Sequence, residues 1–168
     1  MKYHQKAKDI ALSGLLVALM LLLGFIETLI PFPSIVPGIK IGLSNSVLLY
    51  ALYIFGNRRT FLLMVLKVVL SGLLFGGVSA MMYSLAGGIL SVLVMILMRK
   101  IPQMGIVGVS VSGAVAHSAG QVLMAMLVLQ TDKLFYYMAF LSAISVATGL
   151  ATGILAGMVL RSLSKLPQ

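Results

Sequence analysis

The chain has 168 residues and a mean hydropathy of +1.14; 61% of the residues are hydrophobic and 9% are charged. A soluble domain carries roughly a quarter charged residues, so this composition excludes an ordinary soluble domain and predicts a single all-α integral membrane domain over residues 1–168. The absence of cysteine excludes disulfides, thiolate metal sites and a cysteine nucleophile.

Six apolar stretches are separated by polar clusters, Pro and Gly. About 20 apolar residues cross the hydrocarbon core of a bilayer, so the sequence predicts a compact bundle of six transmembrane helices. The predicted spans are residues 9–30, 42–56, 60–76, 80–98, 105–129 and 134–160. The boundary "FGGVSA" between the third and fourth spans is short enough to be either a loop or a kink.

The first span follows a basic start, but its apolar run is longer than the core of a signal peptide, so we expect it to be retained. Small residues recur along its early turns at spacings of four, three and four, and such residues let helix backbones approach closely in membranes. They are Ala7, Ala11, Gly14 and Ala18. This ridge packs either within the chain or against another membrane protein.

Polar residues interrupt the first four spans and the outer loop 31–41, which has three prolines in seven residues and is not expected to be helical. A polar or ionisable group inside a membrane is a candidate for function because it is costly to bury without a partner. These candidates are Glu27, Lys40, Asn45, Lys67 and Tyr83. Glu27 and Lys67 either pair with each other or face a ligand, and Lys40 is either solvated or ligand-facing.

The fifth span contains the stretch "GAVAHSAGQVLMAM" at residues 113–126. His117 and Gln121 lie one helical turn apart and therefore share a face, together with the small residues Gly113 and Gly120. Small residues around a polar pair either allow an interhelical hydrogen bond or leave space for a ligand.

The sixth span begins near Tyr136 and Tyr137, which we expect in the aromatic belt at the membrane interface. Small residues follow at a strict spacing of four and form a second ridge suited to close helix packing. They are Ser145, Gly149, Gly153 and Gly157.

The basic residues are distributed very unevenly over the two sides of a six-span bundle. One side receives nine of them: Lys2, Lys6, Lys8, Arg58, Arg59, Arg99, Lys100, Arg161 and Lys165. The other side receives Lys40 and Lys133. Cytoplasmic loops are enriched in Lys and Arg, so we expect a multi-pass protein of the cell membrane with both termini in the cytoplasm. The net charge of +9 then reports topology and requires no nucleic-acid partner.

The sequence lacks the residues that several common kinds of catalysis require. The acids are Asp9, Glu27 and Asp132, so there is no aspartate-rich motif to hold magnesium diphosphate. There is no Walker A loop and no HExxH motif, and two histidines are too few for a histidine-built metal site. We therefore expect a protein that is not an enzyme and that carries no cofactor or metal.

Three blocks resemble the Gx transporter family, which is often labelled heptaprenyl diphosphate synthase component I. They are "PGIKIGLSNSVLLYALYIFG" (37–56), "SLAGGILSVLVMIL" (84–97) and "GVSVSGAVAHSAGQ" (108–121). That family typically has Asn at the position of Ser118. It is similar in turn to the membrane-embedded substrate-binding S components of energy-coupling factor (ECF) transporters.

This resemblance implies an S-component-like fold and a division of labour in vitamin uptake. An S component captures a small molecule from outside, and a transmembrane coupling protein with two cytoplasmic ATPases drives its release inward. The small residues of the first helix would dock on the coupling protein, and the loop from Pro31 to Lys40 would gate the site. His117 and Gln121 would be ligand-facing.

The charges of Lys40 and Lys67 against Glu27 favour an anionic or zwitterionic substrate, and an apolar pocket suits an aromatic or isoprenoid-like molecule. A precursor of a redox cofactor would meet this description. Two alternatives are a membrane subunit linked to isoprenoid or polyprenyl diphosphate metabolism and a structural subunit of a larger membrane complex.

Overall fold

The structure, a computed structural model, describes residues 2–29 and 43–164, and side chains are described within residues 6–29 and 43–162. The helices are α1 (Lys2–Leu29), α2 (Asn45–Phe55), α3 (Asn57–Ser71), α4 (Gly77–Met98), α5 (Ile106–Leu129) and α6 (Leu134–Ser164). A π-helical turn, η1 (Gly72–Gly76), joins α3 to α4. The predicted all-α fold class is therefore confirmed in this part of the chain. The predicted outer loop and Lys40 lie outside the described residues.

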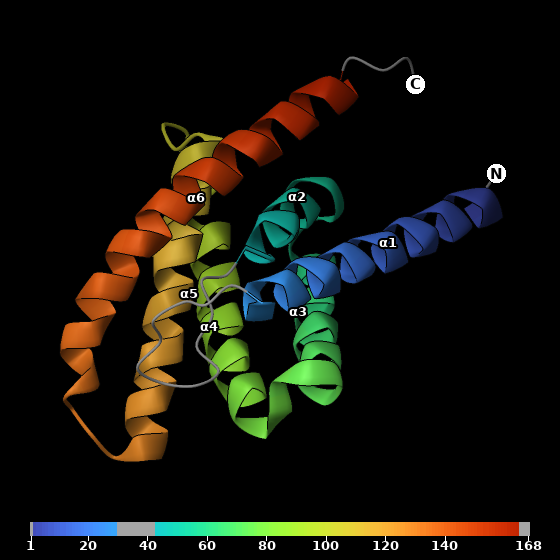
Figure 1. Ribbon diagram of the computed structural model, residues 1–168. Coiled ribbons are helices and arrows are strands. Elements are labelled where there is room, and N and C mark those ends of the chain that lie inside the picture. The colour runs from blue at the N-terminus through green and yellow to red at the C-terminus, as the bar shows by residue number, and fades with distance from the viewer. Residues whose placement is uncertain (1, 30–42, 165–168) are drawn as a thin grey trace.

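Glycines stand at two sharp changes of direction between these helices. Gly56 (φ 76°) separates α2 from α3, and Gly77 (φ 72°) follows η1, both in the left-handed region that favours glycine. Figure 1 shows the chain bending back on itself at η1, so that α3 and α4 form a hairpin. The "FGGVSA" boundary is thus a helical bend with no intervening loop.

The helices are arranged around α5, which packs extensively on both α4 and α6. In Figure 1, α4, α5 and α6 lie side by side, while α1 passes across α3 and lies next to α2, and its N-terminal end extends away from the other helices. The main hydrophobic core joins all six helices, α1 to α6, with Met20, Leu49 and Met64 among its fully buried side chains. The N-terminal end of α1 and the C-terminal end of α6 lie at the same end of the molecule (Figure 1).

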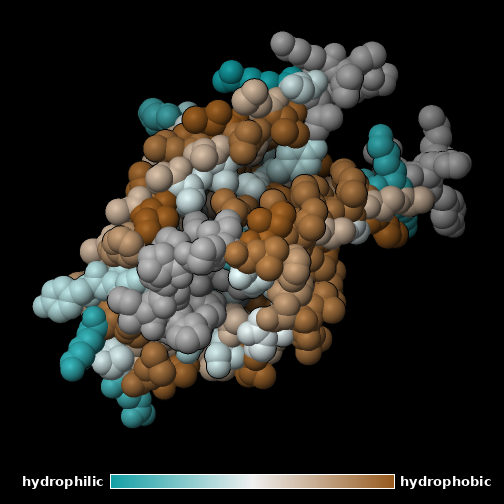
Figure 2. Space-filling view, in the orientation of Figure 1, coloured by the Kyte–Doolittle hydropathy of each residue, from teal (hydrophilic) through white to brown (hydrophobic). Residues whose placement is uncertain are grey.

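The surface is largely apolar, as expected of a chain surrounded by lipid. Figure 2 shows hydrophobic residues over most of one face, with hydrophilic residues gathered at opposite ends. Within the described residues, four stretches are long and apolar enough to cross a membrane: Lys6–Leu29, Asn57–Met98, Ile106–Leu129 and Leu134–Ser162. The chain is thus a multi-pass membrane protein by length and composition, whereas the predicted count of six crossings is not confirmed. The stretch Asn57–Met98 contains the α3–α4 hairpin, and α2 has only 11 residues.

The two small-residue ridges have different environments. The α6 ridge (Ser145, Gly149, Gly153 and Gly157) packs on α5 over its first three members, which are buried. A Cβ at Gly149 would lie 2.8 Å from the Cα of Val111. The α1 ridge (Ala7, Ala11, Gly14 and Ala18) is exposed at every position, and a Cβ at Gly14 would meet nothing within 4 Å.

Tyr136 and Tyr137 do not both occupy the surface. Tyr136 is 85% exposed, but Tyr137 is buried in a second apolar cluster with Leu134 and Leu141. The prediction that Tyr137 belongs to an interfacial aromatic belt is therefore wrong. Consecutive helical residues point about 100° apart, so one of two neighbouring tyrosines faces inward when the other faces outward.

Candidate substrate-binding site

His117 and Gln121 lie at the interface between α5 and α4. Both are buried, with exposed fractions of 3% and 0%. Gly87 of α4 lies directly against them: a Cβ there would be 2.6 Å from the His117 backbone oxygen and 2.8 Å from Gln121 Cγ. Gly120 allows the same approach from the α5 side, because a Cβ there would lie 2.8 Å from the Cα of Gly87. Glycines on both helices therefore bring the two backbones together around the polar pair.

Three polar atoms of this pair lack hydrogen-bond partners among the described residues, while the His117 ring also interacts with the Gly87 backbone. Within residues 2–29 and 43–164, no hydrogen bond reaches Nε2 or Oε1 of Gln121 or Nδ1 of His117. Buried polar atoms are nearly always hydrogen-bonded, and in lipid no water replaces a missing partner. The interhelical hydrogen bond expected of a purely structural pair is thus not seen for Gln121. Its amide keeps two donors and an acceptor available for another group.

Two charged candidates are also buried within the bundle. Lys67 of α3 is 5% exposed, and its positive charge acts on His117. Glu27, near the end of α1, is 7% exposed, and its Oε1 accepts a hydrogen bond of 2.9 Å from the backbone N–H of Leu43. This bond fixes the Glu27 carboxylate close to the start of α2. The direct pairing of Glu27 with Lys67 stays a prediction.

Asn45 is the first residue of α2 and is 8% exposed. Its Oδ1 and Nδ2 have no partner in the described part of the chain, and the same is true of the Oγ of its neighbour Ser44. Ser44 occupies the N-cap position of α2 without making a side-chain cap bond. The beginning of α2 therefore presents unpartnered polar atoms beside the carboxylate of Glu27.

Two buried serines with unpartnered hydroxyls were not among the candidate residues predicted from the sequence. Ser44 and Ser91 are both fully buried, and the Oγ of each lacks a partner within the described ranges. Ser91 lies one helical turn after Gly87, and its Oγ would lie 3.4 Å from a Cβ at Gly113. The only signal in the sequence is a single serine within an apolar run. This signal is weak because a serine hydroxyl can also hydrogen-bond to a backbone carbonyl of its own helix.

Tyr83 lies apart from the charged candidates. It is buried with Val122, Ala125 and Leu141 in the second apolar cluster, one turn before Gly87 on α4. The structure thus brings His117 and Gln121 together at Gly87, and the charge of Lys67 acts on His117. Glu27 and Asn45 share the start of α2.

Three grooves are lined by other residues. One, of about 340 Å³, lies between α1, α2 and α6, and its lining includes Leu16, Tyr50 and Ala156. The second lies between α1 and α3, and the third on the outer side of α4 and α5. His117 and Gln121 line none of these three grooves. Instead, the backbone of Gly87 packs directly against them. Among the residues that the structure describes, no group of three or more His, Cys, Asp or Glu side chains is placed to hold a metal ion.

The comparisons with known proteins give one match. The family described as heptaprenyl diphosphate synthase component I matches residues 16–159, which is most of the chain and includes every polar candidate described above. No curated protein matches, and no solved structure matches. The length of the family match shows that the chain belongs to the heptaprenyl diphosphate synthase component I family.

Proposed function

We propose that this protein is the membrane-embedded substrate-binding (S) component of an ECF-type importer. In this role it captures a small vitamin-like molecule or redox-cofactor precursor and carries out no turnover of its own. The observation that carries the proposal is the Gln121 amide, which is fully buried and unpartnered among the described residues, beside the unpartnered Nδ1 of His117. A bound ligand would supply the missing hydrogen bonds.

The chemistry around this pair favours a substrate with a polar end. Lys67 contributes a buried positive charge and Glu27 a buried negative one, so an anionic or zwitterionic group would find a counter-charge there. The surrounding helices contribute chiefly apolar side chains, which suit an aromatic or isoprenoid-like body. In the structure, Gly87 packs directly against His117 and Gln121. The substrate therefore enters when α4 and α5 separate at Gly87.

The α1 ridge is the proposed docking surface for the transmembrane coupling protein, which works with two cytoplasmic ATPases. Its four small residues face outward, and nothing lies within 4 Å of a Cβ at Gly14. Helices associate closely in membranes through such residues.

The distribution of Lys and Arg supports six crossings with both termini in the cytoplasm. A cysteine in place of Arg99 should then be shielded from an impermeant thiol reagent in intact cells, and one in place of Lys133 should react. Labelling of Arg99→Cys from outside would contradict this orientation.

The test of the binding site compares affinity with stability in the same variants. His117→Ala and Gln121→Ala each leave a buried ligand atom unpaired, which costs about 1–3 kcal/mol. Binding should therefore weaken about ten- to hundredfold. Native mass spectrometry of protein from its own host identifies the co-purified ligand, and binding isotherms and melting curves follow with that compound.

Ser112→Ala is the matched control, because its Oγ donates to the Gly108 backbone oxygen within the same helix. This variant should keep wild-type affinity. Reduced melting temperatures with unchanged affinity in His117→Ala and Gln121→Ala would remove the pair from the binding site and favour a structural role.

A second candidate function follows from the family description, which names a synthase component. A membrane subunit linked to polyprenyl diphosphate metabolism would bind an isoprenoid diphosphate or alter chain elongation by a partner. Purified protein incubated with isoprenoid diphosphates distinguishes the two, since an S component leaves these compounds unchanged.

A further inference from the structure

A groove with charged and apolar walls lies between α1 and α3, away from the proposed substrate site. It has a volume of about 370 Å³. Four lining residues come from α1 and three from α3: Lys6, Asp9, Ile10, Ser13, Arg59, Leu62 and Leu63. The groove is close to the start of both helices, where the sequence places five of its 12 basic residues.

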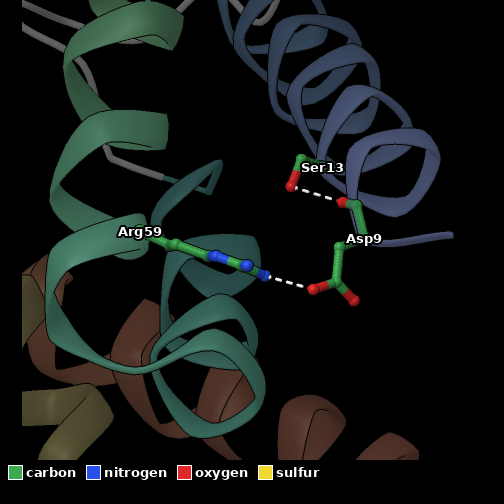
Figure 3. A network of polar contacts seen from close by, with 3 residues as sticks. All are labelled: Asp9, Ser13 and Arg59. Atoms are coloured by element: carbon green, nitrogen blue, oxygen red, sulfur yellow. Dashed lines mark hydrogen bonds and ion pairs between the residues drawn. The ribbon is translucent and has the colours of Figure 1, made fainter. Parts of the chain in front are cut away.

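One ion pair spans the two walls of this groove. Arg59 Nη1 lies 2.6 Å from Asp9 Oδ2, and Ser13 Oγ donates to the Asp9 backbone oxygen over 2.7 Å (Figure 3). The pair is open to the surroundings, with side-chain exposures of 50% for Arg59 and 31% for Asp9. A guanidinium has five N–H donors, so Arg59 keeps donors for another anion while it holds Asp9.

The remaining charge and the apolar walls point to one class of ligand. Lys6 is also exposed at the groove. The three charged lining residues, Lys6, Arg59 and Asp9, therefore carry a net charge of one positive unit. Beside them, Ile10 is 72% exposed and Leu62 is 59% exposed. An anion alone would leave these two side chains uncovered, whereas a phospholipid brings a phosphate and an acyl chain on one molecule.

We propose that this groove binds an anionic phospholipid, with the phosphate held by Lys6 and Arg59 and an acyl chain lying on Ile10 and Leu62. Basic pockets between transmembrane helices on the cytoplasmic side bind lipid head groups, and that leaflet is the one rich in anionic lipids. Asp9 competes with the phosphate for Arg59 and so limits the affinity.

This assignment predicts opposite effects of removing a positive and a negative charge. The purified full-length chain in neutral detergent is titrated with phosphatidylglycerol or phosphatidylcholine, and bound lipids are counted by native mass spectrometry. Phosphatidylglycerol should bind more tightly than phosphatidylcholine. Lys6→Gln should weaken phosphatidylglycerol binding about fivefold, and Asp9→Asn should strengthen it by a similar factor.

Lys133→Gln, an exposed lysine preceding α6, is the control and should leave the affinity unchanged. Equal binding of the two lipids, or equal weakening by Lys6→Gln and Lys133→Gln, would overturn the proposal. Complete competition by inorganic phosphate would assign the groove to a free anion. Unchanged lipid binding in Lys6→Gln together with lost uptake would make the groove a protein contact.

Discussion

The α1 ridge and the α6 ridge have nearly the same residue pattern and opposite surroundings. The α6 ridge is covered by α5, with Gly149 against Val111 and Gly153 against Ser110. At Gly14 of the α1 ridge, no described residue lies within 4 Å of an added Cβ. A row of small residues therefore identifies a helix face built for close approach, and it leaves open whether the partner belongs to the same chain.

Polar side chains distinguish the two ridges better than glycine and alanine do. The face of α6 that packs on α5 carries hydroxyls that bond across the interface: Ser110 Oγ lies 3.1 Å from Thr152 Oγ1, and Ser118 bonds to Ser145. The four positions of the α1 ridge are all Gly or Ala. Hydroxyls that bond across an interface lose that partner when the two helices separate, so a ridge that is free of hydroxyls is better suited to a face that is sometimes bare.

The largest expected effect comes from filling the buried ridge. Gly149→Leu should lower the free energy of unfolding by about 3 kcal/mol, because its Cβ would lie 2.8 Å from the Val111 backbone, which cannot turn aside as a flexible side chain can. Thermal melting in detergent measures the loss. Gly157→Leu is the control on the same ridge, since a Cβ there meets nothing within 4 Å. Equal losses of stability in both variants would mean that contact with α5 is not the reason that Gly149 must stay small.

A smaller and purely functional effect is expected on the exposed ridge. Gly14→Leu and Ala18→Leu should keep the melting temperature and the ligand affinity of the isolated protein. Uptake in cells that contain the coupling module should fall at least about tenfold, because added bulk prevents close helix approach. Leu22→Ala, at an exposed α1 position beyond the ridge, should leave uptake intact. Unfolding of the two ridge variants would show that α1 packs inside the chain.

The smallest effect concerns the hydroxyl pairs of the buried ridge. A double-mutant cycle of Ser110→Ala and Thr152→Val should give a coupling free energy of about 0.6 kcal/mol, typical of hydrogen bonds between membrane helices. Thr152 Oγ1 also lies 2.8 Å from the Thr148 backbone oxygen, so each single variant mixes two bonds. A coupling of several kcal/mol would mean that polar contacts, and not close packing, hold α6 on α5.

The positions of the helices were largely predictable from the sequence. The predicted spans 105–129 and 134–160 correspond closely to α5 (Ile106–Leu129) and α6 (Leu134–Ser164). Long apolar runs bounded by charged or glycine-containing segments leave few other folds in lipid. The hairpin at η1 was not predictable, because its two glycines allow either a kink or a reversal and the choice depends on packing against Met81.

The candidate site was predictable in its residues and not in its arrangement. A lone His, Gln or Lys inside an apolar helix must be buried toward the bundle, and His117, Gln121 and Lys67 are. Which polar atoms stay unpartnered depends on the neighbouring backbone, in this case Gly87 of another helix. The contact between Gly87 and α5 joins residues about 30 positions apart in the sequence, so the local residue pattern does not predict it.

α2 is the shortest α-helix in the described part of the chain. Its 11 residues span about 16 Å, roughly half the thickness of a bilayer hydrocarbon core. One end carries the unpartnered polar atoms of Ser44 and Asn45. At the other end Arg99 donates to the Leu52 backbone oxygen over 2.6 Å and covers the Tyr53 ring at 4.8 Å. Under the proposed function, a substrate held at the Asn45 end would be separated from the Arg99 side by the length of α2, which is about 16 Å.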